Sequence, residues 1–163
     1  MRVRVYPSAA GVRVLIPNPR LQQAGESDDV FLARVANHAA QADPTLDAVA
    51  GVDLAHTELP PDRDFRSAWT LDGAACTIDW PKAREVHRAH LRRARAPKLA
   101  ELDASYLREL ERGLQGKPND VVAKKQVLRD LPQNIQIDAA SSAAELRALW
   151  PTALLGETPY TGQ

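Results

Sequence analysis

The stretch from Trp80 to Gly113 constrains the fold most, because it has the pattern of one long helix. Asp79 is expected to cap its first turn. Pro81 is tolerated in that turn, because an N–H group there would have no partner within the helix. Gly113 and Gly116 supply its stop. Such a helix spans roughly 50 Å, which is more than a compact domain of this size needs. Other parts of the chain, or a partner, must therefore cover it.

Apolar side chains recur along this helix at spacings of three, four and four, which predicts a face that packs against helices. Pro97 is expected to interrupt or kink the helix between its two halves. The face carries Ala83, Val86, His90 and Ala94 in the first half, and Leu99, Leu102, Tyr106 and Leu110 in the second. Because alanine and histidine bury little apolar area, the first half is expected to face a partner or solvent.

The chain before this helix has the alternating pattern of short strands. Strands are expected over residues 2–6, 12–16, 49–54, 68–71 and 74–78. The first two form a hairpin around a five-residue connection, in which Gly11 is available for positive φ. The last two form a second hairpin, for which Asp72 and Gly73 predict a type I′ turn. Only 5% of the residues are aromatic, so Ala, Val and Leu must build most of the core.

Three further helices are indicated by capping residues and apolar spacing. The first is capped by Ser27 or Asp28, has Phe31 on its buried face and ends near Ala42. The others cover residues 119–131 and a segment that starts around Ser142. Ser142 and Glu145 have the spacing of a capping box. Beyond Pro151 the periodicity is lost, which predicts an extended arm.

These elements predict an α+β fold. N-terminal antiparallel β-hairpins with one helix are expected to precede a long helix that forms an antiparallel helical hairpin. The corresponding regions are a β-rich domain over residues 1–78, a helical region over 79–151 and an extended C-terminal arm over 152–163.

Positive charge is concentrated at the start of the long helix, although the chain as a whole has no net charge. Residues 82–98 contain Lys82, Arg84, Arg88, Arg92, Arg93, Arg95 and Lys98, against Glu85 alone. One interpretation is a strip that binds an acidic protein face or nucleic acid. The other is a solvated helix face whose arginines pair with acidic residues of the same chain. Nucleic acid is disfavoured because no aromatic residues or glycine-rich loop accompany the strip.

The candidate partner-binding residues follow from this strip and from the scarce aromatics. Four arginines stand at steps of four, four and three residues and form one row along the helix. Large aromatic residues in an aromatic-poor chain are either core anchors or interface hot spots. The candidates are Arg84, Arg88, Arg92, Arg95, Trp150 and Tyr160.

Motifs for catalysis, cofactors or metals are absent from the sequence. His87 and His90 stand three residues apart near Glu85, but this is not the spacing of a metal site. Cys76 is expected to be a buried, inert thiol, since neither a second cysteine nor a glycine elbow accompanies it. We therefore expect a protein without enzymatic activity, cofactor or metal.

The start of the chain lacks the uninterrupted apolar segment of a signal peptide. Apolar runs also stay well below the length of roughly 18 residues that a membrane span needs. The sequence therefore predicts a protein that stays in the cytoplasm of the cell that makes it and does not contact membranes.

Four segments resemble small proteins encoded among the tail genes of tailed bacteriophages and prophages. They are DRDFRSAWTLDG (62–73), DWPKAREVHRAHLRRARAPKLAELDASYL (79–107), KKQVLRDLP (124–132) and IDAASSAAELRALWP (137–151). The LRDLP segment is also similar to the helical part of phage tail-fibre assembly proteins. The resemblance covers roughly the second two thirds of the chain, and it supplies no catalytic residues.

The resemblance implies a tail-associated structural or adaptor protein that docks onto other tail or fibre proteins, or onto further copies of itself. The alternative that it leaves open is a tail-fibre assembly chaperone that does not remain in the virion. In either role the protein is expected in the host cytoplasm during assembly. The first role also places it in the virion tail.

Overall fold

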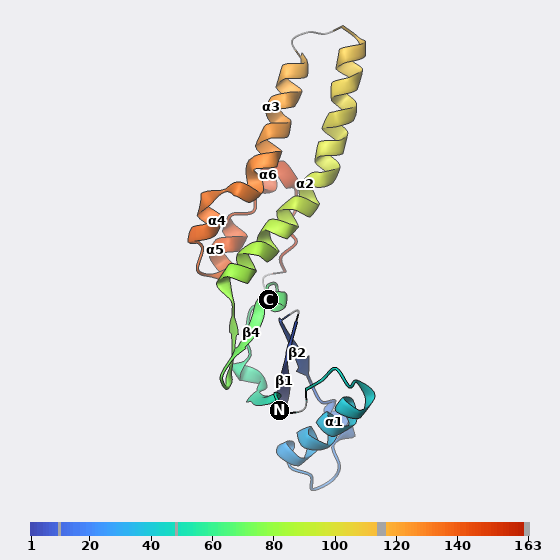
Figure 1. The fold of residues 1–163 in the computed structure, drawn as a ribbon, viewed down its shortest axis with the longest axis vertical. Helices are drawn as coiled ribbons and strands as arrows, with labels where there is room; N and C mark the ends of the chain where they lie inside the picture. Colours follow the sequence, from blue (N-terminus) through green and yellow to red (C-terminus); the bar gives the residue numbers. More distant parts are fainter. Residues whose placement is uncertain (10, 48, 114–116, 162–163) are drawn as a thin grey trace. The chain divides into compact units, whose positions relative to one another are not determined.

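The computed structural model describes residues 1–9, 11–47, 49–113 and 117–161. It confirms the predicted α+β class, with antiparallel hairpins followed by helices (Figure 1). The chain divides into two compact units, of which the first ends at Asp79 and the second begins at Trp80. Each unit is described below by itself.

A three-stranded antiparallel sheet with the order β2-β1-β3 forms the base of the first unit. Its strands are β1 (Arg2–Ser8), β2 (Gly11–Leu15) and β3 (Val52–Ala55). Alternation in β1 turns Val3 and Val5 into the core. It turns Arg4 toward Asp53, its cross-strand neighbour, and the guanidinium holds both carboxylate oxygens. Gly11 has the predicted positive φ, and Ala10 in the connection lies outside the described residues.

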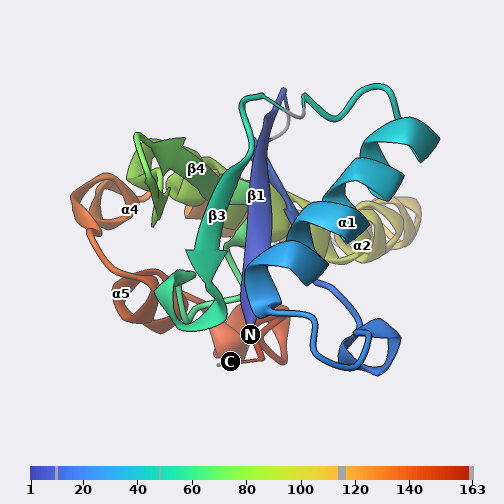
Figure 2. The ribbon, with the colours of Figure 1, turned by 90° about the horizontal axis from the view of Figure 1, so that it is seen from below.

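Helix α1 (Asp28–Ala42) packs against β1 through Phe31, Leu32 and Ala36, and Figure 2 shows it lying along that strand. The hydroxyl of Ser27 accepts a hydrogen bond from the backbone N–H of Val30 and caps the helix start. Short 3-10 helices complete the unit: η1 (Pro19–Leu21), η2 (His56–Glu58) and η3 (Arg66–Ala68).

The second hairpin, β4 (Trp69–Asp72) with β5 (Ala75–Ile78), forms a separate two-stranded sheet. Its turn differs from the type I′ turn predicted over Asp72 and Gly73. Asp72 pairs with Ala75, so the loop residues are Gly73 and Ala74, and only Gly73 has positive φ. This pattern fits a type II′ turn, because in a type I′ turn both loop residues have positive φ.

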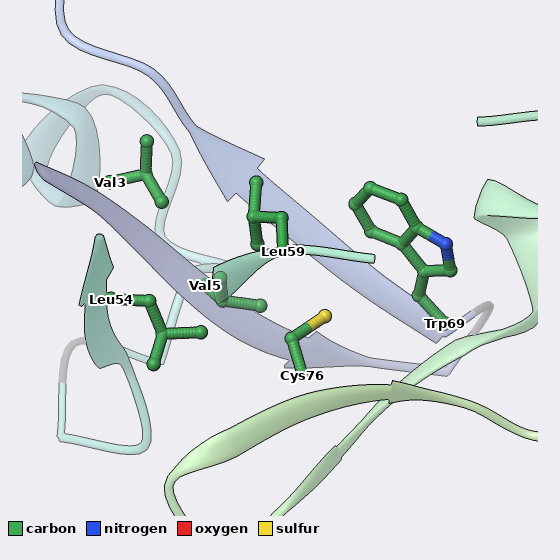
Figure 3. Close-up of a cluster of buried hydrophobic side chains, with 6 residues drawn as sticks. All are labelled: Val3, Val5, Leu54, Leu59, Trp69 and Cys76. Atoms are coloured by element: carbon green, nitrogen blue, oxygen red, sulfur yellow. The ribbon is translucent and has the colours of Figure 1, made fainter. Parts of the chain in front are cut away.

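Side chains from both sheets meet in one core cluster (Figure 3). The cluster comprises Val3, Val5, Leu54, Leu59, Trp69 and Cys76. Trp69 is fully buried, as expected of a core anchor. The thiol of Cys76 is also buried, and burial raises its pKa, which agrees with an inert cysteine.

Helix α2 (Trp80–Glu111) dominates the second unit and continues through Pro97 without interruption. Gly113 has positive φ and its N–H donates to the carbonyl of Leu110, which confirms the predicted stop; Gly116 lies outside the described residues. Helix α3 (Lys117–Asp130) lies beside α2 in antiparallel orientation (Figure 1). It begins two residues before the predicted helix start.

Four short helices follow: η4 (Leu131–Gln133), α4 (Ile135–Ala139), α5 (Ala143–Ala148) and α6 (Thr152–Leu155). The Ser142 hydroxyl caps α5 as predicted, and the carboxylate of Glu145 accepts a hydrogen bond from the N–H of Ser141. Helix α4 was not predicted, because five residues are too few for a helical period. The prediction of an extended arm was also wrong for Thr152–Leu155, which form α6.

The burial of α2 is the reverse of the sequence prediction. Ala83, His87 and Leu91 in its first half are essentially inaccessible, whereas Leu107 and Leu110 in its second half are 58% and 56% exposed. The segments after α3 contact the first half of α2, while α3 is the main neighbour of the second half. Tertiary contacts, and not the size of the side chains, therefore decide which half is covered.

Candidate partner-binding surface

Three of the four predicted arginines on α2 bind backbone carbonyls of the second unit. Arg84 donates from Nε to the carbonyl of Ala140 at 2.9 Å. Arg95 donates to the carbonyls of Leu128 and Arg129. These acceptors lie at the C-terminal ends of α4 and α3, where the last carbonyls of a helix have no partner within the helix. Both arginines therefore serve as caps between packed helices.

Arg88 has the densest set of partners in the row. It donates to the carboxylate of Asp138 at 2.6 Å, to Glu85 at 2.7 Å and to the carbonyl of Pro132 at 3.1 Å. The hydrogen bond to Asp138 is the main reason why the pKa of Arg88 lies above its usual value. Its side chain is 14% exposed, so Arg88 anchors α4 and η4 to α2.

Arg92 differs from the other three arginines. It is 51% exposed, and its contact with Glu85 is a loose ion pair of 3.7 Å. An exposed pair of this kind contributes little to stability, about 0–1 kcal/mol. Partner binding by the arginine row therefore stays a prediction that rests on Arg92, while Arg84, Arg88 and Arg95 make contacts within the fold.

Trp150 and Tyr160 lie inside the second unit. The indole N–H of Trp150 donates to the carbonyl of Gly156 at 3.1 Å, which secures the turn after α6. The rings of Trp150 and Tyr160 meet edge to face, with centroids 6.1 Å apart. Both side chains are buried, so they pack as core anchors of this unit, and partner binding by Trp150 and Tyr160 stays a prediction.

His87 lies beneath these two aromatic residues. Its Nδ1 is 2.5 Å from the hydroxyl of Tyr160, and the two rings stack. Its Nε2 is buried and makes no hydrogen bond within the described residues. Burial lowers the pKa of His87 to about 4, with smaller effects from His90 and Arg88. The sequence predicted that this half of α2 faces a partner or solvent, and the difference arises because the C-terminal segment folds over His87.

The structure gives the residues considered for chemistry no shared site. Tyr160 also stacks on His90, while Glu85 binds Arg88 and Arg92. Among the described residues, no group of three His, Cys, Asp or Glu side chains is placed to hold a metal ion. No helix in the described part of the chain is long and apolar enough to cross a membrane.

Sequence reasoning missed a groove between α2, α3 and α6, which we name the α2–α3 groove. Its volume is about 390 Å³ and its surface is mainly apolar. It is lined by Lys98, Glu101, Leu102, Lys124, Val127, Leu128, Ala153 and Leu154. The helical period brings Leu102 close to Lys98, but only the antiparallel register of α3 adds Val127.

Comparison of the chain with models of protein families, with curated proteins and with solved structures gives no significant match.

Proposed function

We propose that this chain is a non-enzymatic, tail-associated structural or adaptor protein of a bacteriophage, which docks onto tail or fibre proteins. The resemblance of four segments to phage tail-gene products supports this assignment. The helical hairpin of the second unit supplies the docking surface. Arg92, in the middle of α2, adds an exposed positive charge.

The observation that carries the proposal is the exposure of apolar side chains along both helices of the hairpin. Leu107 and Leu110 on α2, with Val122 and Val127 on α3, are each about half exposed. Single exposed apolar residues are ordinary, but four along one pair of helices indicate surfaces that other protein chains cover. The α2–α3 groove lies beside Val127 on the same pair of helices.

The surroundings of the histidines also bear on the choice between a binding role and catalysis. His87 is inaccessible to a substrate and is used to hold the C-terminal segment. Glu85, the nearby carboxylate, is used in ion pairs along α2. His90 differs, because it lines a cleft of about 180 Å³ with Trp150 and Glu157. A binding role is therefore favoured by the placement of His87 and Glu85, and not by that of His90.

Mass spectrometry of purified virions tests the proposal in the phage or induced prophage that encodes the chain. We expect the chain in the particles at several copies, quantified against a known tail protein. Absence from the particles removes the structural role. Recovery only from infected cells, bound to fibre chains, supports the assembly chaperone instead. The resemblance of the LRDLP segment to tail-fibre assembly proteins favours this alternative.

A charge reversal refines the same experiment. Arg92→Glu is expected to lower incorporation, because it removes the exposed charge of the row without breaking a cap between helices. Arg20→Glu is the control, since Arg20 is an exposed arginine of the first unit. Equal incorporation of the two variants and the unmodified chain would exclude a role for the arginine row. Arg88 is unsuitable for this purpose because its replacement would break the contact with Asp138.

A further inference from the structure

The α2–α3 groove combines apolar walls with amino groups that the fold does not use. Lys98 lies on its α2 wall and Lys124 on its α3 wall. Within the described residues neither lysine makes an ion pair, whereas the adjacent Lys125 pairs with Asp103. Glu101 is the carboxylate on the α2 wall, so positive charge predominates around the groove. The groove therefore suits an apolar helix that carries carboxylates at its edge.

The same hairpin carries a segment of that chemistry. At the end of α2, Glu109 and Glu111 stand against Arg108, while Glu101 belongs to the groove and Asp103 pairs with Lys125. Leu107, Leu110 and Glu111 stand at spacings of three and four, so they share one side of the helix. We name this side the acidic ridge. Its two leucines are exposed, and Glu111 makes no ion pair within the described residues.

The ridge and the groove point in different directions from the hairpin. Leu102 in the groove and Leu107 in the ridge are five residues apart, so their side chains point about 140° apart around the helix axis. The same five-residue offset separates Val122 from Val127 on α3. Because the ridge and one wall of the groove are fixed sides of the same helix, α2, the ridge of a chain cannot enter the groove of that chain.

We propose that copies of this chain associate head to tail, with the acidic ridge of one copy in the α2–α3 groove of the next. Leu107 and Leu110 contact Leu102, Val127 and Leu154 of the neighbouring copy. Glu111 pairs with Lys98 and Lys124 of that copy. Such a contact is heterologous, so it closes into a ring or extends as a filament and does not form a two-fold dimer. The inference rests on the proposed function, in which the hairpin is a protein-docking surface.

Light scattering coupled to size-exclusion chromatography measures the association of the full chain. The unmodified chain is expected to show a mass above that of one chain, rising with concentration until a ring closes. Leu107→Glu and Val127→Glu each place a charge in the contact and are expected to weaken it at least about tenfold. Both positions are half exposed, so both variants should keep the far-ultraviolet circular dichroism of the unmodified chain.

Ile135→Glu is the matched control, because Ile135 is an exposed apolar residue of the same unit outside both surfaces. This variant should associate like the unmodified chain. A single-chain mass for the unmodified protein at all concentrations overturns the inference, and so does unchanged association of Leu107→Glu and Val127→Glu.

Mixing the two variants tests the head-to-tail geometry itself. Leu107→Glu keeps an intact groove and Val127→Glu keeps an intact ridge, so a mixture should form species of two chains and nothing larger. A mixture that stays monomeric contradicts the pairing of these two surfaces. Charge exchange gives a second check: Lys124→Glu and Glu111→Lys should each weaken association, and the double variant should recover it.

The outcome is separable from that of the virion experiment. Association in solution without incorporation into particles retains the inference and removes the structural role. Incorporation of a chain that is monomeric in solution retains the structural role and removes the inference of self-association. The groove would then be available to another tail protein.

Discussion

At the scale of single residues, the arginines of α2 show how one residue type acquires two roles. Arg88 and Arg95 reach carbonyls at helix ends, where the planar guanidinium satisfies acceptors that would otherwise be buried without donors. Arg92 is turned away from these acceptors and keeps its charge in solvent. Each arginine of the row therefore either supports the fold or remains available to a partner, according to its own surroundings.

The stability of the protein is expected to fall as the pH decreases from about 6.5 to about 4, because of His87. Its pKa is lowered to about 4 in the folded state, so the unfolded chain binds a proton first. The stabilisation is complete above the unfolded pKa and is lost as the pH falls toward the folded pKa. A shift of this size corresponds to about 3 kcal/mol at most. Chemical unfolding at several pH values measures it.

His87→Gln is the control for this pH effect. Carboxylates also lose stabilising contacts in acid, and Glu26, bound by Arg34, has a pKa lowered to about 2. The difference between the variant and the unmodified chain isolates the contribution of the histidine. If both chains lose stability in parallel between pH 6.5 and 4, His87 is not responsible.

At the scale of elements, α2 consists of two halves with different surroundings. The segments around α4 and η4 contact its first half through Ala140 and Pro132, and α3 accompanies the second half, joined by α6 at the α2–α3 groove. Leu91 is therefore buried and Leu102 is half buried, although both lie on the face toward other helices. Exposure of apolar residues increases toward the end at Glu111.

Alanine substitutions along α2 should follow this gradient. Leu91→Ala is expected to lower the free energy of unfolding by about 2–5 kcal/mol, since it opens a cavity in a closed core. Leu102→Ala is expected to cost about half as much, because its side chain also borders the open groove. Urea unfolding of both variants measures the two losses. An equal or larger loss for Leu102→Ala would contradict the burial pattern.

At the scale of the whole molecule, the chain consists of two units, and each contains its own core. The first is built on Trp69 and its cluster, and the second on Leu91 and Leu146 with the aromatic residues around His87. A unit with its own core is expected to fold alone. The division at Asp79 and Trp80 provides a place to separate them.

Fragments 1–79 and 80–163 are expected to keep their native secondary structure. The sum of their far-ultraviolet circular dichroism spectra should reproduce the spectrum of the intact chain. Cys76 adds a probe of the first fragment, since its buried thiol should react with a thiol reagent slowly, as in the intact protein. A fragment with a fast-reacting thiol and no β signal would show that the first unit depends on the second.

Local patterns in the sequence determined the fold class, the strands of both hairpins, α1 and the extent of α2. They succeeded because strand alternation, Ser27, Ser142 and Gly113 act on residues at most a few positions away. They missed α4 and α6, since helices of four or five residues show no period and are held by contacts elsewhere in the fold.

Only the tertiary structure decided the roles of the candidate site residues. Arg88 meets Pro132 across 44 positions, Arg84 meets Ala140 across 56, and His87 meets Tyr160 across 73. No periodicity within one helix reports on partners so distant in the chain. The same reason hid the α2–α3 groove, because its two walls come from helices whose relative register is set by packing. The sequence thus determined which segments are strands and helices, and packing determined which of their side chains remain available to a partner.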